Sequence, residues 1–116
     1  MYSAELLDHF ANPRNAGHLE APAISVEVVN PACGDILRLA VLWSGDVVEQ
    51  AAFQVRGCTA ALAAGSALTG LIKGRSRREL AHFQPSELEE VLGGLPTASR
   101  HVTALCADAI KAALKS

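Results

Sequence analysis

The stretch LRLAVLWSGDVVEQAAFQVR, residues 37–56, decides the fold of this chain. Its first half places an apolar side chain at every second position, the period of a half-buried strand: Leu37, Leu39, Val41 and Trp43. Ser44-Gly45-Asp46 is typical of a hairpin turn. In the second half Ala51, Phe53 and Val55 share one face. The stretch therefore predicts two antiparallel strands with one face free for helices.

The residues upstream of this hairpin predict a helix and then a third strand. Ser3 can cap a short amphipathic helix, which Pro13 ends. Val26 and Val28 then alternate with polar neighbours, as in a strand. We expect this strand to join the hairpin in an antiparallel meander.

The residues downstream predict helices only. Gly57 ends the strand, and residues 59–72 are rich in alanine, with Gly65 and Ser66 small enough for close approach to the sheet. Capping boxes at residues 76–79 and 86–89 predict two short helices. A last helix, capped by Ser99 or Thr97, is expected to run nearly to Ser116. The predicted fold is α+β, a single domain over residues 1–116 with a three-stranded antiparallel sheet, helices packed on one face and an N-terminal helix.

Composition and charge argue against nucleic-acid binding, membrane insertion and secretion. A net charge of -2 gives no reason to expect nucleic acid, and the basic run at residues 73–78 is typical of a solvated helix start. The weakly polar stretch 58–72 is too short for a membrane span, and the N-terminus shows no secretion signal. We therefore expect a cytoplasmic protein without membrane contact. In that reducing compartment, three widely spaced cysteines favour thiolates or buried thiols over disulfides.

Four residues form a candidate metal site: Cys33, Asp35, Cys58 and His101. Each lies at a predicted turn or element end, and thiolate, carboxylate and imidazole are ligands of zinc and of iron–sulfur centres. Cys58 should precede a helix, whose unpaired N–H groups favour the thiolate. Burial of the cysteines as small apolar residues is the alternative. The histidines at positions 9 and 18 lack partners at metal-ligand spacing and are expected at the surface.

Several strings along nearly the whole chain are similar to the IscU/NifU N-terminal family of iron–sulfur cluster assembly scaffolds. They are the opening from Tyr2-Ser3 to Asp8-His9 with Asn12-Pro13-Arg14-Asn15, then Pro31-Ala32-Cys33-Gly34-Asp35, Gly57-Cys58, and Asp108-Ala109-Ile110-Lys111-Ala112-Ala113. The resemblance implies an IscU/SufE-like two-layer fold and a scaffold rather than an enzyme.

By this resemblance, Cys33, Asp35, Cys58 and His101 hold zinc or a nascent [2Fe-2S] cluster, and Cys33 and Cys58 accept sulfur. A cysteine desulfurase would supply that sulfur as persulfide. An iron donor and cluster-acceptor proteins would be the other partners.

The chain departs from the family at two places. Val102 stands where the family has its third cysteine, and the nearest thiol, Cys106, is one helical turn further on, where a buried thiol is expected. The chaperone-binding motif appears here as Leu95-Pro96-Thr97-Ala98-Ser99, so recognition by the specialised Hsp70 chaperone is not expected.

These departures leave two alternatives to a cluster scaffold. One is a zinc-bound regulator or sulfur-accepting partner of a desulfurase that builds no clusters itself. The other is a catalytic Cys/His/Asp site or a zinc-activated water, for which the sequence shows no substrate pocket or oxyanion hole.

Overall fold

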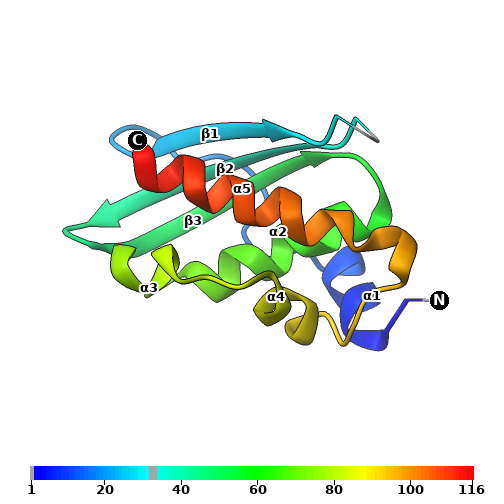
Figure 1. The fold of residues 1–116 in the computed structure, drawn as a ribbon. Coiled ribbons are helices and arrows are strands. Elements are labelled where there is room, and N and C mark those ends of the chain that lie inside the picture. The colour runs from blue at the N-terminus through cyan, green and yellow to red at the C-terminus, as the bar shows by residue number, and fades with distance from the viewer. Residues whose placement is uncertain (1, 32–33) are drawn as a thin grey trace.

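The structure, a computed structural model, describes residues 2–31 and 34–116. Along the chain it contains α1 (Ala4–Ala11), β1 (Ile24–Val29), β2 (Ile36–Ser44), β3 (Val47–Arg56), α2 (Thr59–Ile72), α3 (Arg77–Ala81), α4 (Pro85–Val91), the 3-10 helix η1 (Thr97–Ser99) and α5 (His101–Lys115). The strands form one antiparallel sheet in the order β1-β2-β3, and α2 and α5 lie side by side over one of its faces (Figure 1). The predicted α+β fold is confirmed.

The alternation in the hairpin becomes the buried face of the sheet. Leu37, Leu39 and Val41 are almost fully buried under the helices. Leu39 pairs with Phe53 across β2 and β3, and Leu37 pairs with Val28 of β1. The period-two pattern therefore fixed both the register and the face that receives α2 and α5.

Helix α2 approaches the sheet closely because position 65 has no side chain. A Cβ atom on Gly65 would lie 2.5 Å from Cδ2 of Phe53, so the predicted role of this glycine is confirmed. The neighbouring Ser66 binds α1 and the turn after it: its Oγ lies 2.8 Å from His9 Nδ1 and accepts the Arg14 backbone N–H at 2.8 Å. His9 is half-buried, and its expected place at the surface was wrong because α1 packs on α2.

The helix starts are only partly as predicted. The capping box at residues 76–79 is confirmed for α3, but the one predicted at residues 86–89 is wrong. Helix α4 begins two residues earlier, with Gln84 in the cap position and Pro85 in the first turn. The Glu87 carboxylate accepts the Gln84 backbone N–H at 2.9 Å. Proline favours the first helical position because it lacks the N–H that would be unpaired there.

Helix α5 also starts differently from the prediction. Thr97 and Ser99 do not cap it; they form the separate turn η1, and α5 begins at His101 with Arg100 in the cap position. The Arg100 carbonyl accepts the Thr103 hydroxyl at 2.8 Å. The site histidine is thus the first residue of the helix, directly behind a tight turn.

The basic run at residues 73–78 is used partly within the fold. Arg75 pairs with Glu87 of α4 at 2.9 Å. The Arg77 guanidinium lies 4.0 Å from the centre of the Trp43 ring and donates to the Leu114 carbonyl of α5 at 3.2 Å. The expectation of a solvated helix start was wrong for these two arginines. Arg75 joins the segment before α3 to α4, and Arg77 joins α3 to α5 and the hairpin.

No helix in the described part of the chain is long and apolar enough to cross a membrane. Helix α5 has 15 residues, whereas a spanning helix needs about 20.

Candidate metal centre

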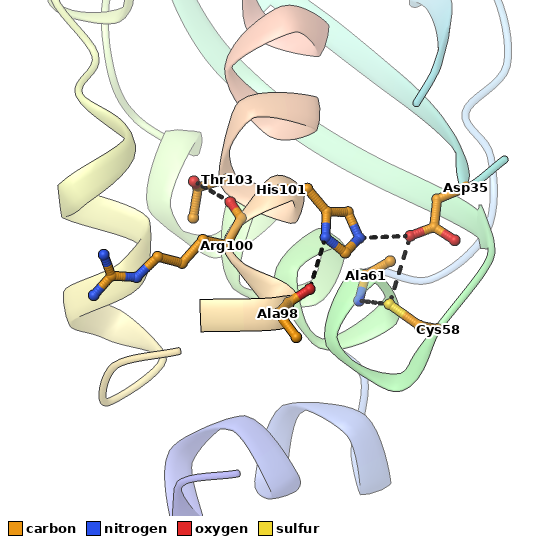
Figure 2. Close-up of polar contacts among 7 residues, drawn as sticks. All are labelled: Asp35, Cys58, Ala61, Ala98, Arg100, His101 and Thr103. Carbon is orange, nitrogen blue, oxygen red and sulfur yellow. Dashed lines mark hydrogen bonds and ion pairs between the residues drawn. The ribbon is translucent and has the colours of Figure 1, made fainter. Parts of the chain in front are cut away.

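Three of the four predicted ligands meet at one end of the sheet. Asp35 directly precedes β2, Cys58 is the N-cap of α2, and His101 is the first residue of α5. One donor atom from each lies within 4.8 Å of the other two (Figure 2). Cys33 lies outside the described residues, so its membership of the site remains a prediction.

The carboxylate of Asp35 is the centre of this cluster. Its Oδ2 atom lies 3.5 Å from Cys58 Sγ and 3.3 Å from His101 Nε2. The residue is only 5% exposed, and a Cβ atom on Gly57 would stand 2.5 Å from Asp35 Oδ1. The missing side chain at position 57 therefore makes room for the carboxylate beside the thiol.

The thiol of Cys58 is held between this carboxylate and the start of α2. It donates to Asp35 Oδ2, and its sulfur accepts the Ala61 backbone N–H at 3.4 Å. Partial burial of the sulfur raises the pKa of Cys58, the Asp35 charge adds to this rise, and the Ala61 N–H opposes it. The start of the helix thus favours the thiolate, as predicted, but burial and the Asp35 charge together hold the pKa of Cys58 above its ordinary value.

The imidazole of His101 is held at both nitrogens. Nδ1 lies 3.1 Å from the Ala98 carbonyl oxygen, and Nε2 faces Asp35 (Figure 2). The carbonyl and the carboxylate both accept hydrogen bonds, so each contact is a hydrogen bond when the ring nitrogen in it carries a hydrogen. The side chain is 32% exposed, which leaves the ring accessible from outside.

Neither Val102 nor Cys106 adds a donor to the site. Val102 is fully buried, since one residue along the helix turns the side chain by about 100° away from the direction of His101. Cys106 is 1% exposed, and burial raises its pKa to about 12. The expectation that Cys106 is a buried thiol is confirmed.

Two of the three donor spacings match those of a tetrahedral metal site. Metal–ligand bonds of about 2.1 Å to nitrogen or oxygen and about 2.3 Å to sulfur place ligand atoms roughly 3.4–3.6 Å apart. The contacts from Oδ2 to Nε2 and to Sγ, at 3.3 and 3.5 Å, already have this spacing. All three donor atoms lie within 4.8 Å of one another, so one sulfur, one nitrogen and one oxygen could bind the same ion.

Two groups that shape the site were missed at the level of sequence. Gly57 was interpreted as the end of a strand and as part of the Gly57-Cys58 string, but not as the residue that leaves room for the Asp35 carboxylate. The Ala98 carbonyl is a backbone group, and nothing in the alanine side chain marks it.

The model of the NifU-like N-terminal domain matches residues 1–116. The chain belongs to this family. Several known members of the family are similar to this chain over nearly its whole length.

Known relatives of this chain are named as scaffolds. The chain is 38% identical over 114 residues to iron–sulfur cluster assembly scaffold protein IscU 1 of Archaeoglobus fulgidus, and the match covers 98% of this chain and 74% of the relative. It is also 38% identical to the IscU scaffold proteins of Azotobacter vinelandii and Haemophilus influenzae, covering 98% and 97% of this chain and 91% and 92% of theirs.

Solved structures share the fold. A SUF-system scaffold candidate from Fervidobacterium islandicum superposes with a TM-score of 0.79 at 19% identity, covering 97% of this chain and 96% of that one. At this identity the likeness concerns the fold alone.

Proposed function

We propose that this chain is a scaffold for iron–sulfur cluster assembly rather than an enzyme. A nascent [2Fe-2S] cluster, or zinc in its place, would bind through Cys33, Asp35, Cys58 and His101. The observation that carries the proposal is the convergence of three different donors, from Asp35, Cys58 and His101, within 4.8 Å of one another. The scaffold names of relatives that match nearly the whole chain support it.

Sulfur would enter as persulfide from a cysteine desulfurase. The Cys58 thiol gives up its proton, for which Asp35 Oδ2, its hydrogen-bond acceptor, is the adjacent base. The thiolate attacks the outer sulfur of the desulfurase persulfide, so that one S–S bond breaks, another forms on Cys58, and the desulfurase cysteine leaves as thiolate. An external electron donor supplies two electrons per sulfur to release sulfide. We propose the same acceptor role for Cys33.

The iron donor and cluster-acceptor proteins complete the set of partners. The single scaffold domain would work in the cytoplasm. Recognition by a specialised Hsp70 chaperone is not part of the proposal, because the segment 95–99 lacks the second proline and the lysine of the family motif.

A specific observation favours a second candidate. Val102 and Cys106 are both buried, so neither supplies the third thiolate that the family uses. A site with fewer thiolates suits zinc, which takes mixed nitrogen, oxygen and sulfur ligands. The second candidate is therefore a zinc-bound regulator or sulfur-accepting partner of a desulfurase that does not build clusters.

Anaerobic reconstitution with ferrous iron and sulfide separates the two candidates. A scaffold is expected to gain visible absorption and bound iron, and Cys58→Ala and His101→Ala should lose both. Cys106→Ala is the matched control, because this thiol is buried outside the site. Retention of zinc alone would support the second candidate, and failure to bind either metal would refute both.

Sulfur transfer has its own test. With a purified desulfurase and radiolabelled cysteine, sulfur label should appear on the wild-type chain and fall in Cys58→Ala. Equal labelling of both proteins would exclude Cys58 as an acceptor.

A further inference from the structure

We propose that the backbone carbonyl of Ala98 is a positioning group that selects Nε2 of His101 as the metal-ligating nitrogen. The inference rests on the proposed metal-binding function of the same site. It concerns a part of the chain, the turn η1, that contributes no ligand itself.

Both ring nitrogens of His101 face acceptors. The Ala98 oxygen lies 3.1 Å from Nδ1 and Asp35 Oδ2 lies 3.3 Å from Nε2, so a neutral ring with one hydrogen can donate to only one of them. Within residues 2–31 and 34–116, no backbone N–H donates to this carbonyl, whereas the carbonyls of Pro96, Thr97 and Arg100 each accept a backbone N–H. The ring of His101 is therefore the partner that satisfies it.

The turn that presents this carbonyl is closed by a backbone hydrogen bond across it. The Ser99 N–H donates to the Pro96 carbonyl at 2.8 Å, and Ser99 itself is buried. Directly after the turn, the Arg100 guanidinium pairs with Glu89 of α4 at 3.3 Å. These contacts hold η1, and with it the Ala98 carbonyl, beside the start of α5.

The surroundings of the ring decide which nitrogen binds an ion. When Nδ1 donates the single hydrogen of the neutral ring to Ala98, Nε2 presents its lone pair 3.3 Å from Asp35 Oδ2. Two lone pairs that face each other need a proton or a cation between them. A metal ion bound by Nε2, Oδ2 and Cys58 Sγ satisfies both, and a hydrogen bond to the other ring nitrogen is the usual way in which proteins orient a ligating histidine.

The first test observes the ring directly. Long-range nitrogen–proton NMR of histidine-labelled protein with Zn²⁺ bound should show zinc on Nε2 of His101 and the ring hydrogen on Nδ1. Zinc on Nδ1 would overturn the inference.

The second test moves the carbonyl with a matched pair of proline substitutions. Thr97→Pro places proline at the first position of η1 after Pro96, whose ψ of 147° suits a following proline. Ala98→Pro instead disfavours the helical conformation of Thr97 and unwinds the turn. Neither change removes a backbone hydrogen bond donated by the substituted residue.

We expect Ala98→Pro to weaken Zn²⁺ binding about 10-fold or more and to mix the two neutral forms of the His101 ring. Thr97→Pro should keep the wild-type ring form and the wild-type dissociation constant. Equal Zn²⁺ affinity in both folded variants would overturn the inference, and the wild-type NMR result decides it if Ala98→Pro does not fold.

These outcomes separate this inference from the proposed function. Absence of Zn²⁺ and iron binding by the wild-type protein would refute the proposed function and the inference with it. Metal binding through Nδ1, or equal Zn²⁺ affinity of the two folded proline variants, would refute the inference alone and leave the proposed function standing.

Discussion

Gly57→Ala should weaken metal binding without touching a ligand. The added Cβ would lie 2.5 Å from Asp35 Oδ1 and 2.7 Å from its Cγ, whereas ordinary contact begins at 3.4 Å. The carboxylate must therefore retreat by about 0.9 Å, well beyond the roughly 0.2 Å that ligand distances tolerate. The φ angle of Gly57 is not in the left-handed region, so the backbone accepts alanine and the clash is the main effect.

A displacement of this size should raise the Zn²⁺ dissociation constant about 10- to 100-fold, the range seen when groups supporting a ligand are lost. This corresponds to about 1.4–2.8 kcal/mol of binding free energy. Competition with a chromophoric chelator at neutral pH measures it, with circular dichroism to verify the fold.

Gly70→Ala is the matched control for this substitution. Gly70 lies in α2 with open space around it, so alanine should leave Zn²⁺ affinity unchanged and stabilise the helix by about 0.5–1 kcal/mol. A double-mutant cycle with Asp35→Ala adds a further check, because without the carboxylate the Gly57 substitution should cost little more. Wild-type affinity in folded Gly57→Ala would refute the reasoning.

Three further predictions concern buried groups. Iodoacetamide at pH 8 should label Cys58 but not Cys106 in the native chain, because burial raises the Cys106 pKa to about 12; equal labelling rates would contradict its burial. Burial lowers the His9 pKa, so between that depressed pKa and the ordinary value of about 6.5 the folded chain binds fewer protons than the unfolded chain. This stability is present above pH of about 6.5 and is lost as the pH falls; urea unfolding should show it, and His9→Asn, which can still bond Ser66, should reduce the pH dependence. Val102→Cys should cost about 1 kcal/mol in the same assay and leave Zn²⁺ affinity unchanged, since position 102 faces the core; a tenfold gain in affinity would show that the thiol reaches the site.

The fold could be predicted where side-chain period and burial agree. Leu37 and Leu39 lie on either side of the exposed Arg38, and both point to the buried face of the sheet. His9 could not be placed this way, because its burial depends on Ser66, which is 57 residues away in the chain. The residues next to His9 in the sequence do not predict such a long-range contact.

Part of the candidate site could be predicted from the sequence and part could not. Asp35, Cys58 and His101 could be chosen by residue type and by their place at element ends, and the structure brings them together. The burial of Val102 could also be predicted, because Leu105 and Cys106 follow it at helical spacing on one apolar stripe of α5. The Ala98 carbonyl has no side-chain signal at all.

The distances in sequence between the site residues have a consequence for the chain as a whole. Cys58 is 23 residues from Asp35, and His101 is 66 residues from it. An ion held by all three is thus also a reversible cross-link that ties two helix starts to the sheet and restricts the unfolded chain, as a disulfide would. An ion or cluster that binds the folded chain alone adds its binding free energy to stability. If the chain acts as the proposed scaffold, transfer of its cluster would remove this tether between α5 and the sheet, and chains with and without a cluster would differ in their resistance to unfolding.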